Sequence, residues 1–269
     1  MAVQEYQAEI SRRNPTCIVF LIDQSASMNG KFGHQPEKKL AEGVADILND
    51  TLANLCIRAS RDAGMADYFY LGIIRYHSIK DASQMDVNRV ESALQGALQG
   101  EKLAPISRLA LSPLRVKEVK KLAKDPMGRE VTKTNRQQVW VEPHGEGNTP
   151  LAEALAMAAD WVKGFIAGHP GCFPPQVINL TDGRPTTDPR PNAKALCDLR
   201  SSDGNVLFFN VHITDKALTT VEYPGTEAVL PQEEKTAKLA RLLYGMSSIL
   251  PEKYRVMAQA MGMTLPDQA

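Results

Sequence analysis

Four short apolar segments alternate along this chain with stretches of helical periodicity, and this alternation restricts the possible folds most strongly. The segments are typical of buried strands and cover Cys17 to Ile22, Tyr68 to His77, Gln176 to Gly183 and Val206 to Ile213. Apolar residues at helical spacing predict helices at 40–55, 152–167, 233–244 and 251–261. Strands that alternate with helices predict a mostly parallel sheet with right-handed crossovers. We therefore expect an α/β fold, with a doubly wound, Rossmann-like sheet flanked by helices.

Residues 78–138 do not fit a single strand–helix unit. Their basic run, Arg115 to Lys124, is interleaved with apolar residues, which favours a solvated helix face. We predict an edge strand followed by a helical elaboration on the surface. Since no linker or internal repeat divides the sequence, we expect one domain over residues 1–269. Its core would cover 15–215, and a helical extension would cover 230–262.

Charge and cysteine usage narrow the classes of function. Lys+Arg and Asp+Glu are equal at 31 each, whereas proteins that bind nucleic-acid phosphates usually carry excess positive charge. No apolar run is long enough to span a membrane, and the N-terminal residues lack the apolar segment of a signal peptide. The four cysteines form no CxxC pair. We therefore expect a reduced, cytoplasmic protein whose partners are neither nucleic acid nor membrane.

Three polar clusters occur where the chain leaves a predicted strand or enters a predicted helix. Asp23, Ser25 and Ser27 follow the first strand, Thr149 precedes the helix at 152–167, and Asp182 follows the third strand. In open parallel sheets, ligands bind at the carboxyl ends of the strands, near the point where strand order reverses. All five side chains offer hard oxygen donors, which Mg²⁺ and Mn²⁺ prefer. The pattern therefore predicts a site for Mg²⁺ (or Mn²⁺).

Each cluster is also compatible with a purely structural role. Asp23 and Ser25 belong to residue types that cap helices well, and Thr149 fits a helix cap before a proline. Asp182 with the following glycine fits an ordinary turn. The DxSxS spacing alone would occur by chance in roughly 1 chain in 20 of this length. The order of the three clusters therefore carries the prediction.

The histidines show no metal-ligand spacing in the sequence. The five are His34, His77, His144, His169 and His212. Of these, His34 and His144 fall near the predicted site loops, and their positions are compatible with the rim of the site.

The three site loops resemble those of the von Willebrand factor A (VWA) domain family. The matching motifs are LIDQSASM, GNTPLAEAL and NLTDGRP, and the resemblance covers most of the chain. The stretch from Trp140 to Asp182, with FFNVHI and MSSILPEKYRVMAQAMG, is similar to a bacterial cytosolic subgroup. Members of this subgroup are often encoded beside protein phosphatases and Ser/Thr kinases. The family has a doubly wound sheet and a metal-ion-dependent adhesion site that takes a carboxylate from a partner protein as its final ligand.

The resemblance implies a role for each predicted site residue. Ser25, Ser27 and Thr149 would supply hydroxyl ligands, and Asp23 and Asp182 would bind the cation directly or through water. The implied function is a metal-dependent protein–protein interaction module that does not catalyse a reaction. Its partner would donate an Asp or Glu to the metal, and the protein would be a subunit or scaffold of a bacterial signalling or stress-response complex.

Two alternatives from other classes remain open. A metal-dependent phosphoester hydrolase with Asp23 as nucleophile would need a second acid two residues later, where this chain has Ser25. A regulatory substrate of a neighbouring Ser/Thr kinase is the other alternative. A phosphate on Ser25 or Ser27 would occupy the hydroxyl that the metal requires.

Overall fold

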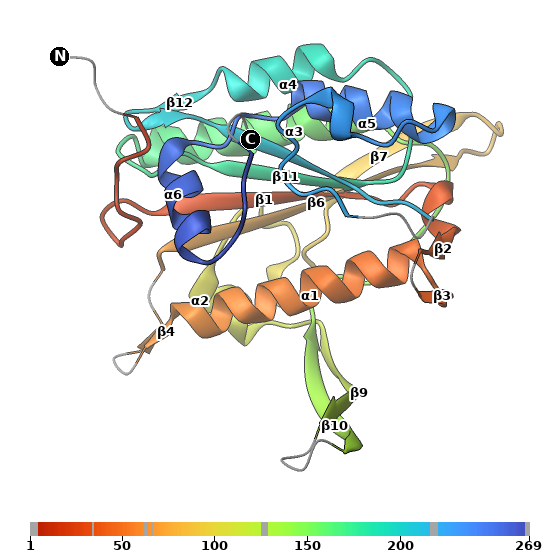
Figure 1. Cartoon of the computed structure of the whole chain (residues 1–269), viewed down its shortest axis with the longest axis horizontal. Coiled ribbons are helices and arrows are strands. Elements are labelled where there is room, and N and C mark those ends of the chain that lie inside the picture. The colour runs from red at the N-terminus through yellow and green to blue at the C-terminus, as the bar shows by residue number, and fades with distance from the viewer. Residues whose placement is uncertain are drawn as a thin grey trace.

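A mostly parallel sheet forms the centre of the structure (Figure 1). The computed structural model describes residues 5–33, 35–61, 64–65, 67–124, 129–215 and 220–266. Within them the sheet has six strands in the order β14-β11-β1-β6-β7, with β8 paired to β6. Their bounds are β1 (Thr16–Asp23), β6 (Phe69–Lys80), β7 (Asp86–Ser92), β8 (Ala104–Pro105), β11 (Gln176–Thr181) and β14 (Leu207–His212). Strands β14, β11, β1 and β6 are parallel to their neighbours in this group, whereas β7 and β8 pair with β6 antiparallel.

Helices cover both faces of this sheet, with α1 and α2 on one face and α3, α4 and α5 on the other (Figure 1). The helices are α1 (Leu40–Ala59), α2 (Ile106–Leu111), α3 (Leu151–Gly168), α4 (Arg190–Cys197), α5 (Glu234–Met246) and α6 (Glu252–Ala260). The expected α/β, doubly wound, Rossmann-like architecture is therefore confirmed. The helix α4 was not expected from the sequence.

The continuous apolar run of β1 reflects burial on both faces of the sheet. All eight of its residues are buried. Ile18 and Phe20 pack into the hydrophobic cluster that includes α1, and Val19 and Leu21 pack into the cluster that includes α3. Because successive side chains of a strand point to opposite faces, a strand covered on both sides must be apolar throughout.

The strand order places the switch point of the sheet between β1 and β11. After β1 the chain passes to β6 on one side, and it later returns to β11 on the other side. Strands β1 and β11 lie side by side in register, with Ile22 opposite Leu180. The loops that follow these two strands therefore leave the sheet in opposite directions, which opens a crevice at their carboxyl ends.

The segment 78–138 agrees only in part with the sequence-based expectation. The predicted edge strand is present as β7, and the segment contains the short helix α2. The basic run predicted as a helix face is instead strand β9 (Arg115–Lys124), which pairs antiparallel with β10 (Glu130–Val139). The resulting hairpin extends past α1, away from the sheet (Figure 1).

The hairpin was missed because its apolar residues fit a helix. Val116, Val119 and Leu122 recur every three residues, a spacing that favours one face of a helix. Pairing with β10, a segment that includes the β-branched residues Val131 and Thr132, outweighs this local pattern. The signal that could have revealed the hairpin is the sequence Asp-Pro-Met-Gly between the two strands, since Pro and Gly favour turns.

Short elements complete the described structure. They are the paired strands β2 (Lys31–Phe32) and β3 (Gln35–Lys39), β4 (Ser60–Arg61) and β5 (Gly64–Met65), and β12 (Arg200–Ser201) and β13 (Gly204–Asn205), with the 3-10 helices η1 (Ala26–Asn29), η2 (Gly96–Leu98) and η3 (Glu227–Val229). Of these, η1 carries the predicted site residue Ser27 and begins three residues after the end of β1.

Candidate functional site

Asp23 anchors the site at the end of β1. Its side chain is fully buried, and its Oδ1 accepts a hydrogen bond from the backbone N–H of Ser25 at 2.8 Å. Its Oδ2 accepts a hydrogen bond from the hydroxyl of Thr181, the last residue of β11. The two neighbouring strands are thus joined at their carboxyl ends by a carboxylate.

A chain of oxygen atoms leads from Asp23 toward solvent. The Oγ atoms of Ser25 and Ser27 lie 3.0 Å apart, and Ser27 donates from Oγ to Oδ1 of Asp182 at 2.7 Å. Ser25 is buried, Asp182 is partly buried and Ser27 is exposed. The first and third predicted clusters therefore meet, with one side open to solvent.

Thr149 reaches the same point from the start of α3. A Cβ built on Gly183 would lie 2.5 Å from Oγ1 of Thr149, 2.7 Å from Oδ2 of Asp23 and 3.2 Å from Oγ of Ser25. Three oxygen atoms, two from the end of β1 and the loop after it and one from the segment before α3, therefore surround one small space in front of Gly183. The structure thus brings together all five predicted site residues.

Thr181 and Gly183 were missed as site residues by the sequence analysis. Thr181 fixes the orientation of the Asp23 carboxylate, and Gly183 keeps the space between the oxygen atoms free of a side chain. Both adjoin Asp182 in the sequence, so their position next to a predicted ligand is the signal that could have found them.

Neither of the two proposed capping hydroxyls caps a helix. Ser25 precedes η1 and makes no side-chain cap hydrogen bond. The N-cap of α3 is Pro150, again without a side-chain cap, and Thr149 lies one residue earlier. The purely structural interpretation of Ser25 and Thr149 as caps is therefore wrong, although Asp23 does bind the nearby N–H of Ser25.

The electrostatics of the site favour a cation. Burial raises the pKa of Asp23, and the hydrogen bonds from Ser25 and Thr181 only partly oppose this rise. Burial also raises the pKa of Asp182 to about 6, with a further increase from the negative charges of Asp23 and Asp215. A divalent cation would favour the ionised form of both carboxylates. The hard oxygen donors present fit Mg²⁺ or Mn²⁺.

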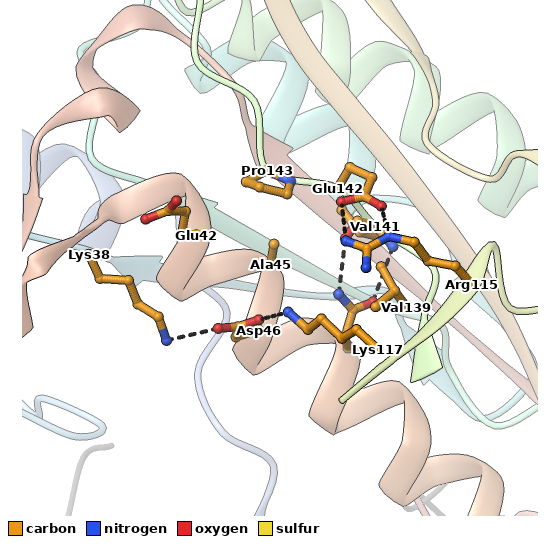
Figure 2. Close-up of a pocket in the computed structure, with 11 residues that line it drawn as sticks. Lys38, Glu42, Ala45, Asp46, Arg115, Lys117, Val139, Val141, Glu142 and Pro143 are labelled. Atoms are coloured by element: carbon orange, nitrogen blue, oxygen red, sulfur yellow. Dashed lines mark hydrogen bonds and ion pairs between the residues drawn. The ribbon is translucent and has the colours of Figure 1, made fainter. Parts of the chain in front are cut away.

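A second polar region lies between α1 and the base of the β9–β10 hairpin (Figure 2). It encloses a cavity of about 260 Å³. Lys117 forms an ion pair with Asp46 at 2.6 Å, and Arg115 forms one with Glu142 at 2.6 Å. The backbone carbonyl of Glu142 accepts a hydrogen bond from Nε2 of Gln24 at 3.3 Å. The base of the hairpin is thereby linked to the loop after β1.

Of the two histidines predicted near the site loops, the structure describes only His144. His34 lies outside the described residues. His144 lies in the loop that leads to Thr149, with an exposed side chain that forms an ion pair with Glu146 when the imidazole is protonated. Its ring also contacts that of His77, from the end of β6.

Comparisons with known proteins do not identify this chain. No family model matches it, and no curated protein matches it significantly. Among the described helices, none is long and apolar enough to cross a membrane. The resemblance to VWA domains therefore rests on the three loop motifs.

Proposed function

We propose that this chain is a VWA-type protein–protein interaction module that depends on Mg²⁺ or Mn²⁺. Asp23, Ser25, Ser27, Thr149 and Asp182 would hold the cation, directly or through water. The observation that carries the proposal is the convergence of these five side chains at the switch point of the sheet. Ser27 and Asp182, for example, lie 155 residues apart in sequence and form a direct hydrogen bond.

The donor set supports recruitment of an outside carboxylate. Three of the five donors are neutral hydroxyls, so a bound cation would keep a large part of its charge. Asp23, Ser25 and Thr149 are buried beneath the exposed Ser27, so the site is reached from one side. An Asp or Glu of a partner protein is the group best suited to approach from that side, because Mg²⁺ and Mn²⁺ favour carboxylate ligands.

The donor set supports binding better than hydrolysis. A hydrolase with Asp23 as nucleophile would use an acid at the position of Ser25 to protonate the leaving group. The Ser25 hydroxyl instead lies 3.0 Å from that of Ser27. We place the module in a bacterial cytoplasmic signalling or stress-response complex, with a kinase or phosphatase system among its partners. This context rests on the resemblance of the sequence motifs.

The test is capture of a partner by the tagged full chain in the presence of Mg²⁺ or of EDTA. Ser27→Ala and Asp182→Ala remove proposed ligands, and Ser83→Ala and Asp160→Asn change exposed residues elsewhere as matched controls. All variants must first melt like the wild type. We expect retention of the same partner by the wild type and the controls with Mg²⁺ only.

Two outcomes would overturn the proposal. Retention of the partner in EDTA, or by Ser27→Ala and Asp182→Ala, would place the contact elsewhere on the molecule. Direct titration with Mn²⁺ gives an independent readout. Without a partner carboxylate we expect millimolar binding, which corresponds to about 4 kcal/mol, and Ser27→Ala should weaken it.

A further inference from the structure

His77, His144 and Glu146 form a cluster of potential metal ligands beside the five-oxygen site, which is made of Asp23, Ser25, Ser27, Thr149 and Asp182. One ligand atom from each residue lies within 4.8 Å of the other two. Nε2 of His144 is 3.5 Å from Oε2 of Glu146, and the rings of His77 and His144 have centroids 4.7 Å apart. Two ligands of a tetrahedral zinc ion are separated by about 3.4 Å, given bonds of roughly 2.0–2.1 Å. The cluster is therefore close to the size that one cation requires.

The loop that carries two of these residues is held in place by its backbone. The N–H of Glu146 donates to the carbonyl of Gln24 at 2.8 Å, and the N–H of Ala26 donates to the carbonyl of Gly147 at 2.9 Å. The N–H of Asn148 donates to Oγ of Ser78 at 2.8 Å. These bonds tie the loop both to the segment after β1 and to the end of β6. His144 and Glu146 are thus held near His77 before a cation binds. Binding would therefore require little further ordering of the backbone.

The environment of His77 resembles that of a metal-ligating histidine. The residue is buried, and its Nδ1 lies 3.3 Å from the backbone carbonyl of Ser78. A proton on Nδ1 that is shared with this carbonyl leaves the lone pair of Nε2 for a metal, as in many metal sites. The side chains of His144 and Glu146 are exposed, so a cation can enter from solvent.

We infer that His77, His144 and Glu146 bind a zinc ion through two imidazole nitrogens and one carboxylate oxygen. Imidazole is a borderline ligand that suits Zn²⁺, whereas Mg²⁺ favours oxygen. The inference is therefore independent of the proposed Mg²⁺ or Mn²⁺ site. Three protein ligands leave the fourth tetrahedral position for water or for another group.

The test is zinc affinity of the metal-stripped full chain, measured by competition with a chromophoric chelator. His144→Ala and Glu146→Gln each remove one exposed ligand, and neither should unfold the protein. His169→Ala is the matched control, because His169 follows the far end of α3. We expect one zinc ion per chain for the wild type and the control, and at least about tenfold weaker binding for the two ligand variants.

Two further measurements distinguish this site from other zinc ligands. The chain also has four free cysteines, whose thiolates are alternative zinc ligands. Because the proposed site contains no cysteine, the Co²⁺-loaded protein should show no thiolate-to-metal absorption. Ser27→Ala should keep its zinc, because that residue belongs to the five-oxygen site. Equal zinc affinity of the wild type and His144→Ala would overturn the inference. Thiolate absorption, or loss of zinc binding in Ser27→Ala only, would also overturn it. None of these outcomes would affect the proposed Mg²⁺-dependent interaction, because the zinc inference is independent of it.

Discussion

The carboxyl edge of the sheet and the base of the β9–β10 hairpin both gather charged side chains, but they compensate the charge differently. At the sheet edge, Asp23 and Asp182 are partnered by hydroxyl and N–H groups, and burial raises the pKa of both. At the hairpin base, burial also acts to raise the pKa of Asp46. There the hydrogen bonds and charges of Lys117 and Lys38 outweigh burial and lower it.

The sheet edge is therefore suited to binding a ligand, whereas the hairpin base is suited to stabilising the fold. At the sheet edge the described partners of Asp23 and Asp182 are hydroxyl and N–H groups, and a bound cation would stabilise the ionised form of both carboxylates. At the hairpin base, Asp46 already pairs with Lys38 and Lys117 (Figure 2). Substitutions at the first region should therefore change ligand binding. Substitutions at the second should change stability without removing the ligand site.

The largest change in stability is expected from Asn49→Ala, next to the hairpin base. The Asn49 side chain is buried and accepts hydrogen bonds from the N–H groups of Trp140 and Val141, and it donates to the carbonyl of Val141. Its removal leaves three backbone groups without these partners and should lower the free energy of unfolding by about 3 kcal/mol. Urea denaturation measures this loss. Asn88→Ala, at an exposed asparagine, is the control and should cost much less.

The same variant tests whether the two regions act independently. If Asn49→Ala remains folded, its Mg²⁺-dependent partner binding should equal that of the wild type. A selective loss of binding in the folded variant would show that the hairpin base and the sheet edge are coupled and do not act independently.

Gly183→Ala should have the next largest effect, at the sheet edge. Its Cβ would fall among oxygen atoms of Thr149, Asp23 and Ser25, with the closest at 2.5 Å. We expect a loss of about 1–3 kcal/mol in stability from overpacking, together with loss of Mg²⁺-dependent binding. Gly164→Ala is the matched control, because nothing lies within 4 Å of its added Cβ in α3. That control should stabilise the helix by about 0.5–1 kcal/mol.

The outcome for Gly183→Ala bears directly on the proposed site. If both alanine variants bind the partner equally well with Mg²⁺, the space in front of Gly183 does not hold the cation. The sheet edge would then differ from the hairpin base in electrostatics but not in ligand binding.

The two carboxylates should give opposite pH profiles in metal-free protein. Asp182 has a pKa raised to about 6 by burial, so the folded state binds its proton more tightly than the unfolded state. Wild type should therefore gain stability relative to Asp182→Asn as the pH falls from about 6 to about 4. Asp46 has a lowered pKa, so its contribution is present above the unfolded pKa of about 3.9 and is lost as the pH falls below it.

Thermal melts in EDTA between neutral and acidic pH measure both profiles. Each aspartate is compared with its asparagine variant at every pH, so other titrating groups cancel. Profiles of the same sign for Asp182 and Asp46 would contradict the opposite pKa shifts of the two carboxylates.

Arg115→Ala should have the smallest effect. Both side chains of the Arg115–Glu142 ion pair are exposed, and exposed ion pairs contribute at most about 1 kcal/mol to stability. The loss should shrink further in high salt. Chemical denaturation measures the loss in the free energy of unfolding. The control is Arg190→Ala, which removes a similarly exposed ion pair with Asp188. A loss well above that of the control would show that Arg115 holds the hairpin as an integral part of the fold.

The fold class could be predicted because the central strands and their helices have strong local patterns. The run from Cys17 to Ile22 is apolar at every position, and β1 is indeed buried on both faces. The apolar spacing at 152–167 similarly agrees with α3. The hairpin could not be predicted in this way, because Arg115 to Lys124 carries a helix-like spacing and becomes a strand only through pairing with β10.

The sequence by itself determined the α/β class and the positions of Asp23, Ser25, Ser27, Thr149 and Asp182 at the ends of predicted elements. These features depend on burial and on neighbours close along the chain. Only the tertiary structure decided that Thr181 would bind Asp23 and that Gly183 would lie among three oxygen atoms. Tertiary structure alone also brought His77 beside His144. Such contacts join segments far apart in sequence, and they depend on strand order and loop packing, which local spacing does not encode.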